Sequence, residues 1–311
     1  NHTAMKTFEI NRILVPIDFS EVSLNALGTA IAISKRQLAT LTLIHIIENG
    51  YTLYPPEAGA FAGSVLPELV DGANEYLNDL AKKIRLEHDV VVNHIVLSGN
   101  AADEICRWGF HKEIDLIVMG THGASGFREF FLGSNAYRVV KNAPCPAMTI
   151  PGTNQWIDFK KILFPIRMVP HALDKYEVIR PIIRKNGSSL LIAGVIQKND
   201  PAGLTEMKAL VDAVRKNIAE DEVKCESDIY NCENVSRQVL DIANIEKPDL
   251  IVITATLDTS LRDFFLGPYT QDIVNHSQYP VLSIRPAFRI KSLSSLSDLT
   301  LHSTEHPIPL L

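Results

Sequence analysis

The chain has 311 residues and a mass of 34.5 kDa, longer than one ordinary domain and close to two of about 155 residues each. Apolar residues make up 46 % and charged residues 21 %, which excludes a disordered, collagen-like or coiled-coil chain. Thirty basic and thirty-six acidic residues give a net charge of −6, with no dense basic stretch. The charge therefore argues against nucleic acid as a partner.

The sequence shows no sign of secretion or membrane insertion. Its start lacks the apolar stretch of a signal peptide, and no uninterrupted apolar run reaches the roughly 18 residues that cross a bilayer. Four scattered cysteines form no C-x-x-C pair and fit reduced thiols better than a zinc site. We therefore expect a cytoplasmic protein without a membrane partner.

In the first half, predicted strands and helices alternate. Short apolar, β-branched runs predict strands at 13–17, 41–47, 90–97, 116–119 and 145–150. Apolar residues at helical spacing predict helices after an N-cap at Ser20, over 66–84, over 101–110 and over 134–142. The Gly-, Pro- and Ala-rich segment from Asn49 to Val65 predicts a long loop.

The second half of the chain repeats the first. Residues 12–18 return as 161–167, at an offset of 149, and residues 128–133 return as 262–267, at an offset of 134. The first copy therefore carries 15 extra residues. Strands separated by helices indicate parallel sheets with right-handed crossovers. We predict an α/β fold of two repeated doubly wound, Rossmann-like domains, each with a five-stranded parallel sheet.

The repeat also predicts domain boundaries. The first domain is expected over 5–151 and the second over 159–286, with a short connector between them. The final strands, 145–150 and 281–284, each leave an unpaired sheet edge, so we expect them to pair antiparallel in an intramolecular pseudo-dimer. Two lobes on a flexible tether are the alternative, and a further homodimer stays open. The Ser- and Leu-rich extension 287–311 lies outside the repeat, and its role is not predicted.

Candidate phosphate-binding residues lie where strands end. Open parallel sheets bind ligands at the carboxyl ends of their strands. The fourth strand leads into Gly120 and Gly123, and Gly133 and Ser134 open the following helix. Glycine amides and a helix start suit an anion such as phosphate. A carboxylate, Asp18, ends the first strand, which makes this combination stronger than a glycine-rich turn alone.

These motifs resemble the universal stress protein family in its tandem two-domain form. The family's nucleotide motif is Gly, two residues, Gly, nine residues, Gly, then Ser or Thr, and the residues from Gly120 to Ser134 match it without a gap. Pro16-Ile17-Asp18 matches the opening Pro-x-Asp of the family, and His45-Ile46 matches its second strand. The resemblance implies the adenine nucleotide alpha hydrolase-like form of the fold.

The resemblance also implies an ATP site in the first copy. Asp18 and the Ile46 backbone would hold adenosine, and any Mg²⁺ would bind mainly through the phosphates. No catalytic or metal-ligating side chain is expected. The residues expected to bind the nucleotide are Pro16, Ile17, Asp18, Ile46, Met119, Gly120, Gly123, Gly133, Ser134 and Asn135.

The second copy departs from the motif. Arg167 replaces the carboxylate, while Thr254 and Leu257 replace the first two glycines. Gly267 is retained, but Pro268 replaces the serine and removes both a hydroxyl and a backbone N–H. We therefore predict one nucleotide per chain, bound in the first copy.

The sequence is compatible with three functional classes. The first is an ATP-binding protein with a regulatory or stress-response role and at most weak ATP hydrolysis. The second is a scaffold that binds no nucleotide and acts through protein contacts. The third is an enzyme, which would hydrolyse ATP slowly, transfer an adenylyl group or act as a dinucleotide-dependent dehydrogenase. The last is disfavoured because its glycines should follow the first strand, where Pro16-Ile17-Asp18 stands instead.

Overall fold

The computed structural model describes residues 8–48, 59–121, 132–152, 154–169, 172–198, 201–258 and 265–285. Three sequence predictions therefore fall outside the described residues, wholly or in part. They are the first part of the expected loop, the glycine-rich turn that contains Gly123, and the extension 287–311.

The first repeat alternates strands and helices, as its sequence pattern predicts. Its elements are β1 (Arg12–Pro16), α1 (Glu21–Gln37), β2 (Thr40–Ile47), α2 (Gly59–His88), β3 (Val92–Ser98), α3 (Ala101–His111), β4 (Leu116–Gly120), α4 (Ser134–Asn142) and β5 (Ala147–Ile150). Ser20 caps α1 as expected, because its side chain accepts a hydrogen bond from the Ser23 amide.

The second repeat follows the same order. Its elements are β6 (Lys161–Ile166), α5 (Lys175–Asn186), β7 (Ser189–Gln197), α6 (Pro201–Ala219), β8 (Cys225–Cys232), α7 (Val235–Glu246), β9 (Leu250–Thr254), α8 (Pro268–His276) and β12 (Val281–Ile284). A short antiparallel hairpin, β10 (Leu257–Asp258) with β11 (Phe265–Leu266), was not predicted.

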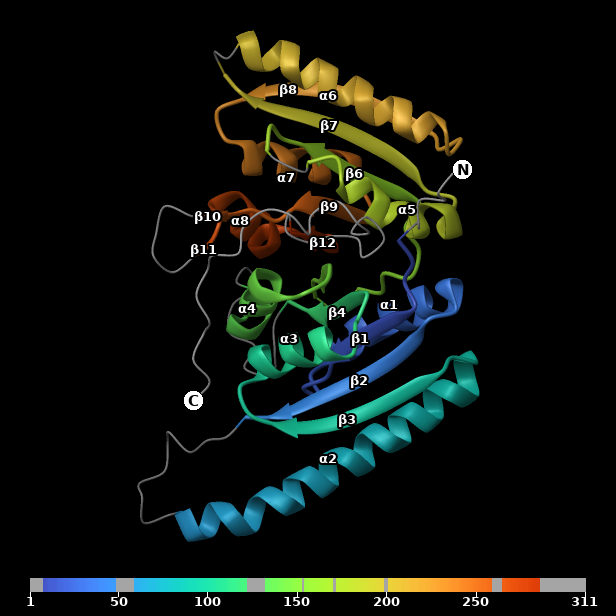
Figure 1. Ribbon diagram of the computed structural model, residues 1–311, viewed down its shortest axis with the longest axis vertical. Helices are drawn as coiled ribbons and strands as arrows, with labels where there is room; N and C mark the ends of the chain where they lie inside the picture. The colour runs from blue at the N-terminus through green and yellow to red at the C-terminus, as the bar shows by residue number, and fades with distance from the viewer. Residues whose placement is uncertain are drawn as a thin grey trace, which may run out of the picture.

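Both repeats contribute five strands to one ten-stranded sheet, in the order β3-β2-β1-β4-β5-β12-β9-β6-β7-β8. Pairing is parallel within each repeat and antiparallel at the seam between β5 and β12, where Val281 pairs with Thr149 and Ser283 with Ala147. The two final strands thus cover each other's edges, as the sequence predicts. Figure 1 shows the first repeat in the lower half and the second in the upper half.

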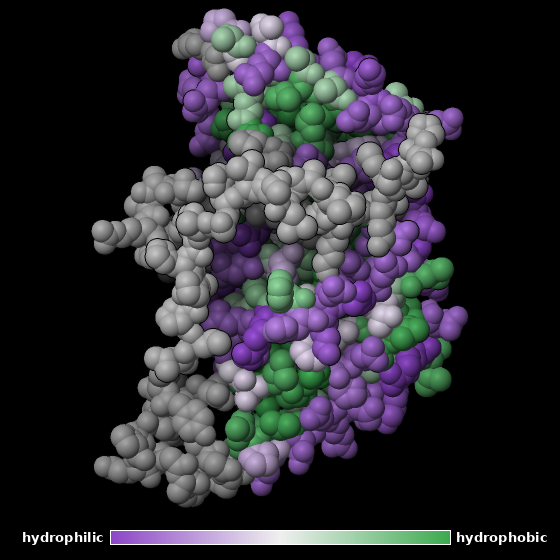
Figure 2. Space-filling model, viewed as in Figure 1, coloured by the Kyte–Doolittle hydropathy of each residue, from purple (hydrophilic) through white to green (hydrophobic). Residues whose placement is uncertain are grey.

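Helices cover both faces of this sheet. A continuous apolar core packs α1, α2, α5 and α6 on one face and runs across both repeats. On the other face each repeat has its own core, under α3 and α4 in the first and under α7 and α8 in the second. Polar side chains cover most of the described surface in Figure 2, with apolar ones in separate patches. No helix in the described part of the chain is long and apolar enough to span a membrane.

The loop predicted over 49–65 is wrong for its last part, because α2 begins at Gly59 and continues through Pro67. This helix has 30 residues, whereas its counterpart α6 has 19, so most of the extra length of the first repeat is helical. The proline and glycine residues of the segment 49–65 are typical of a loop, which led to the incorrect prediction. The apolar face further along, with Leu77, Ala81 and Ile84 buried, anchors the helix to the sheet.

The connector between the repeats is bound to α1 rather than free. The side-chain amide of Asn25 donates to the carbonyl oxygens of Gly152 (3.1 Å) and Asn154 (2.8 Å). Arg36 donates to the Ile157 carbonyl at 2.5 Å and pairs with Asp158. Together with the β5–β12 pairing, these contacts contradict the alternative of two lobes on a flexible tether.

Candidate functional site

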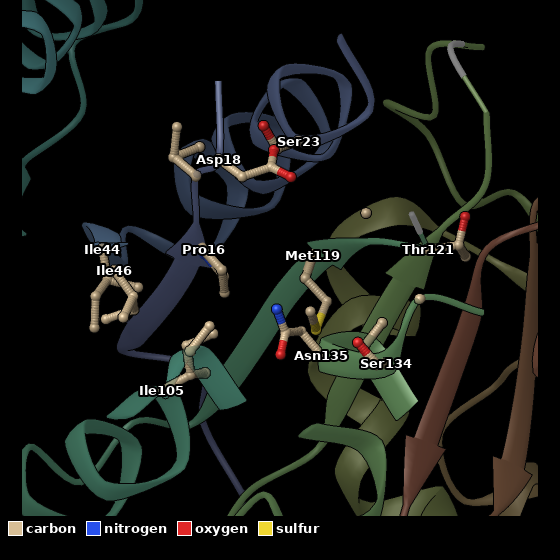
Figure 3. A pocket seen from close by; sticks show the side chains of 15 residues that line it. Pro16, Asp18, Ser23, Ile44, Ile46, Ile105, Met119, Thr121, Ser134 and Asn135 are labelled. Carbon is tan, nitrogen blue, oxygen red and sulfur yellow. The ribbon is translucent and has the colours of Figure 1, made fainter. Parts of the chain in front are cut away.

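A cavity in the first repeat opens at the carboxyl ends of β1 and β4. These strands are neighbours in the sheet, and the chain order reverses between them, which is where doubly wound folds bind ligands. The described residues that line the cavity are Pro16, Ile17, Asp18, Ser23, Ile44, Ile46, Ala101, Ile105, Met119, Gly120, Thr121, Gly133, Ser134, Asn135 and Ala136. Figure 3 shows how those it labels surround the space.

The structure brings nearly all of the sequence-predicted site residues together here. Every member of the predicted set lines the cavity except Gly123, which lies outside the described residues. The set comes from four separate segments of the chain, namely the ends of β1, β2 and β4 and the start of α4. These residues therefore line one cavity, and we propose their binding role below.

The Asp18 carboxylate is held in place by the residue that caps α1. Its Oδ1 accepts hydrogen bonds from the Ser20 amide at 3.1 Å and from the Ser20 hydroxyl at 2.6 Å. Between them, Phe19 has a positive φ of 65°, which is uncommon for a bulky residue and marks a sharp turn. The segment from β1 to α1 therefore fixes the carboxylate at the cavity wall.

His45 contacts that same segment. Its Nδ1 lies 2.7 Å from the Ile17 carbonyl oxygen, and its ring lies 4.4 Å from the Phe19 ring, measured between centroids. The residue lies in β2, as the match to the family's second strand implies, and is half-buried. His45 thus joins β2 to the turn that carries Asp18.

The start of α4 supplies the polar end of the cavity. Gly133 is the N-cap, and no side chain caps the helix there, so the first amides of α4 are not satisfied by a cap. Ser134 is the exposed first residue of this helix. The side-chain amide of Asn135 donates to the Glu48 carboxylate at 3.1 Å, which ties the helix start to the end of β2. A helix start of this kind attracts anions.

Apolar side chains form the opposite wall, and sequence reasoning missed several of them. Ile44, Ala101 and Ile105 line the cavity with the predicted Ile46 and Met119. The first two residues of α3 follow the carboxyl end of β3, so the strand-end rule that led to Gly120 could have found Ala101. Ile105, one turn further on, required the helix orientation. The cavity therefore has an apolar side and a polar side.

The corresponding place in the second repeat is a wider groove with different chemistry. Arg167, the counterpart of Asp18, lies with its guanidinium carbon 3.5 Å from the centre of the Tyr269 ring. It also donates to the Thr254 carbonyl oxygen at 3.2 Å. Burial lowers the pKa of Arg167, while contact with Tyr269 opposes that shift. Pro268 stands at the start of α8 without an N–H, as predicted.

Arg167 thus contacts both the end of β9 and the start of α8. Thr254 and Tyr269 are the counterparts of Gly120 and Asn135, which both line the cavity of the first repeat. In the described part of the chain, no group of three or more His, Cys, Asp or Glu side chains is arranged to hold a metal ion.

Comparison with known proteins matches both repeats to one family. The universal stress protein family matches residues 9–151 and 159–285. Universal stress protein MJ0531 of Methanocaldococcus jannaschii is 34 % identical over 139 residues, which cover 45 % of this chain and 81 % of that protein. Universal stress protein YxiE of Bacillus subtilis is 30 % identical over 148 residues, covering 45 % of this chain and 98 % of that protein. Each of these relatives therefore corresponds to about half of this chain.

A solved structure shares the two-repeat architecture. The universal stress protein from Archaeoglobus fulgidus aligns with a TM-score of 0.73 and covers 90 % of this chain and 100 % of its own, at 20 % identity. At that identity the likeness concerns the fold. With both repeats matched by the family and the fold in agreement, the chain belongs to the universal stress protein family, in a tandem two-domain form.

Proposed function

We propose that this protein binds ATP in the cavity of the first repeat and acts as a regulatory protein of the stress response. The observation that carries the proposal is the meeting of three chemistries in one cavity. Ile46, Ile105 and Met119 offer an apolar wall for a base, Asp18 offers acceptors for ribose hydroxyls, and Ser134 begins a helix suited to phosphate. The cytoplasm, where ATP is plentiful, is the expected location.

The proposal assigns one nucleotide to each chain. In the second repeat Arg167 supplies a cation where ribose would need an acceptor, and it crosses toward Tyr269. Pro268 has neither the hydroxyl nor the amide that Ser134 offers. These differences disfavour ATP in the second groove through lost hydrogen bonds to both the sugar and the phosphates.

Mg²⁺ would accompany ATP through its phosphate oxygens. Asp18 is the one carboxylate among the described residues that line the cavity, and its Oδ1 already accepts two hydrogen bonds from Ser20. Magnesium commonly keeps several waters and binds through substrate phosphates with few protein ligands, so this donor set fits the ion. The proposal includes binding and assigns no hydrolytic step.

Calorimetric titration of the full chain with ATP tests the proposal. We expect a stoichiometry of one, and a rise in melting temperature with ATP, since a ligand of the native state stabilises it. Asp18→Ala should weaken binding by about 1–3 kcal/mol, because the ribose hydroxyls lose their acceptor.

Two variants at equivalent helix starts provide a matched comparison. Ser134→Ala should weaken ATP binding, whereas Pro268→Ala, at the same position in the second repeat, should leave it unchanged. Two sites per chain would contradict the assignment to the first repeat. No heat and no thermal shift with ATP would favour the alternative in which the protein is a scaffold without a nucleotide.

A further inference from the structure

Two backbone amides are bound across the seam between the repeats. The Leu132 N–H donates to Oδ1 of Asn275, a residue of α8, at 3.2 Å. The Leu266 N–H donates to the hydroxyl of Tyr137, a residue of α4, also at 3.2 Å. Leu132 and Leu266 are counterparts in the two repeats, at an offset of 134. The repeats therefore exchange equivalent hydrogen bonds but use different side chains as acceptors.

The leucine side chains make the same exchange. Leu266 belongs to the second repeat, yet it is 3 % exposed and packs in the core under α3 and α4 of the first. Leu132 packs against that core and also against the core under α7 and α8. Figure 1 shows α8 directly above α4 at this seam. Each leucine thus packs against the other repeat.

In the first repeat, Leu132 and Gly133 lead into the phosphate end of the candidate site. The Gly133 amide donates to the Thr121 carbonyl at 2.8 Å, and the Tyr137 amide donates to the Gly133 carbonyl at 2.9 Å. Ser134 follows immediately and lines the cavity. Two backbone bonds from the first repeat and the Asn275 bond from the second therefore fix the Leu132–Gly133 segment that presents Ser134.

We propose that Asn275 is a positioning residue for the phosphate end of the first-repeat site. The second repeat, which lacks the nucleotide motif, would then hold the Leu132–Gly133 segment of the first in the geometry that binds phosphate. This inference rests on the proposed ATP binding in the first repeat. The adenosine end is built from β1, β2 and α3, and none of the described residues that line it bonds to Asn275. Loss of the Asn275 bond should therefore act on phosphate recognition alone.

The experiment compares ATP and adenosine binding to the full chain. Asn275→Ala leaves the Leu132 amide without its acceptor. Phosphate binding must then also order the Leu132–Gly133 segment. We expect the dissociation constant for ATP to rise roughly 3- to 10-fold, as for the loss of one hydrogen bond, and that for adenosine to change by less than about twofold. Amide hydrogen exchange at Leu132 should also become faster in this variant.

Tyr137→Phe is the matched control, because it removes the equivalent bond at Leu266 and leaves the bond between Leu132 and Asn275 in place. It should lower stability to a similar extent while keeping the ratio of ATP to adenosine affinity at the wild-type value. An unchanged ratio of ATP to adenosine affinity in Asn275→Ala, whether both ligands bind more weakly or neither does, would overturn the positioning role while leaving ATP binding in place. Absence of ATP binding to the wild-type chain would remove the proposed function, and this inference with it.

Discussion

Val22, in the first turn of α1, lies directly against Gly120 at the end of β4. A β-carbon on Gly120 would come within 2.7 Å of Val22 Cγ1 and 3.2 Å of the Val22 backbone. In the second repeat Thr254 replaces Gly120, and α5 begins eight residues after Arg167, whereas α1 begins three residues after Asp18. The glycine is therefore required by the close approach of a helix, in addition to any role toward phosphate.

This packing predicts the effect of Gly120→Ala. The added methyl group must displace Val22 or the start of α1, and we expect a loss of about 1–3 kcal/mol in the free energy of unfolding, as in other overpacked cores. Urea denaturation measures it. Gly28→Ala lies in the middle of the same helix, where no atom stands within 4 Å of the place its methyl group would take, and should instead stabilise the protein by about 0.5–1 kcal/mol. Equal stability of the two variants would contradict the packing argument.

A second prediction concerns the degenerate repeat. Arg167→Asp restores the carboxylate of the motif but leaves Thr254 and Pro268 in place. Because the phosphate end still lacks the hydroxyl and the amide of a serine, we expect the ATP stoichiometry in calorimetric titration to remain at one. A second bound ATP in this variant would show that the arginine alone excludes the nucleotide.

The order of strands and helices could be predicted because each element has a local cause. Apolar runs gave the strands, and the Ser20 cap gave the start of α1. The pairing of β5 with β12 followed from two sheet edges that needed cover. The predicted start of α2 was wrong because the Gly-, Pro- and Ala-rich residues before Leu66 suggest a loop, while the buried face that holds the helix lies further along the chain.

The part of the candidate site that escaped prediction depends on distant contacts. Ile105 reaches the cavity only because α3 packs in one orientation on the sheet. Asn275 meets Leu132 although 143 residues separate them, and its own repeat lacks the motif that drew attention to the first. The clash between Val22 and a side chain at position 120 depends on where α1 begins. No local pattern encodes these three relationships.

The connector provides a third prediction. Asn25 and Arg36 of α1 bind it at both ends, while the β5–β12 pairing holds the repeats independently. In the double variant Asn25→Ala, Arg36→Ala we expect faster cleavage between the repeats in limited proteolysis, because the connector backbone loses its partners. The cleaved halves should still elute together in gel filtration.

Lys35→Ala is the control for that experiment, since it alters the exposed neighbour of Arg36 on the same helix. Its cleavage rate should equal that of the wild-type chain. If the double variant is cleaved no faster than this control, the anchoring contacts do not protect the connector. If the cleaved halves separate, the sheet pairing is weaker than its position in the core suggests.

The last prediction concerns acid stability and rests on Asp221, which follows α6 and has a side chain only 2 % exposed. Its carboxylate accepts hydrogen bonds from the Tyr176 hydroxyl (2.7 Å), Arg180 (2.6 Å) and Arg184 (2.7 Å). Burial alone would raise the pKa of Asp221, but these bonds outweigh it and lower the pKa from 3.8 to about 2. The bonded, ionised form therefore stabilises the folded state.

Because the folded pKa lies below the unfolded one, this stabilisation is fully present above about pH 4 and is lost as the pH falls toward about 2. Asp221→Asn should lower the free energy of unfolding at pH 7 by about 2 kcal/mol, and its difference from wild type should shrink through that acid range. Denaturation curves from pH 7 to 2 measure both. Asp79→Asn, which removes an exposed ion pair with Lys82, should change stability by less than about 0.5 kcal/mol at every pH. A constant difference between Asp221→Asn and wild type across the range would mean that the carboxylate does not titrate as its three donors require.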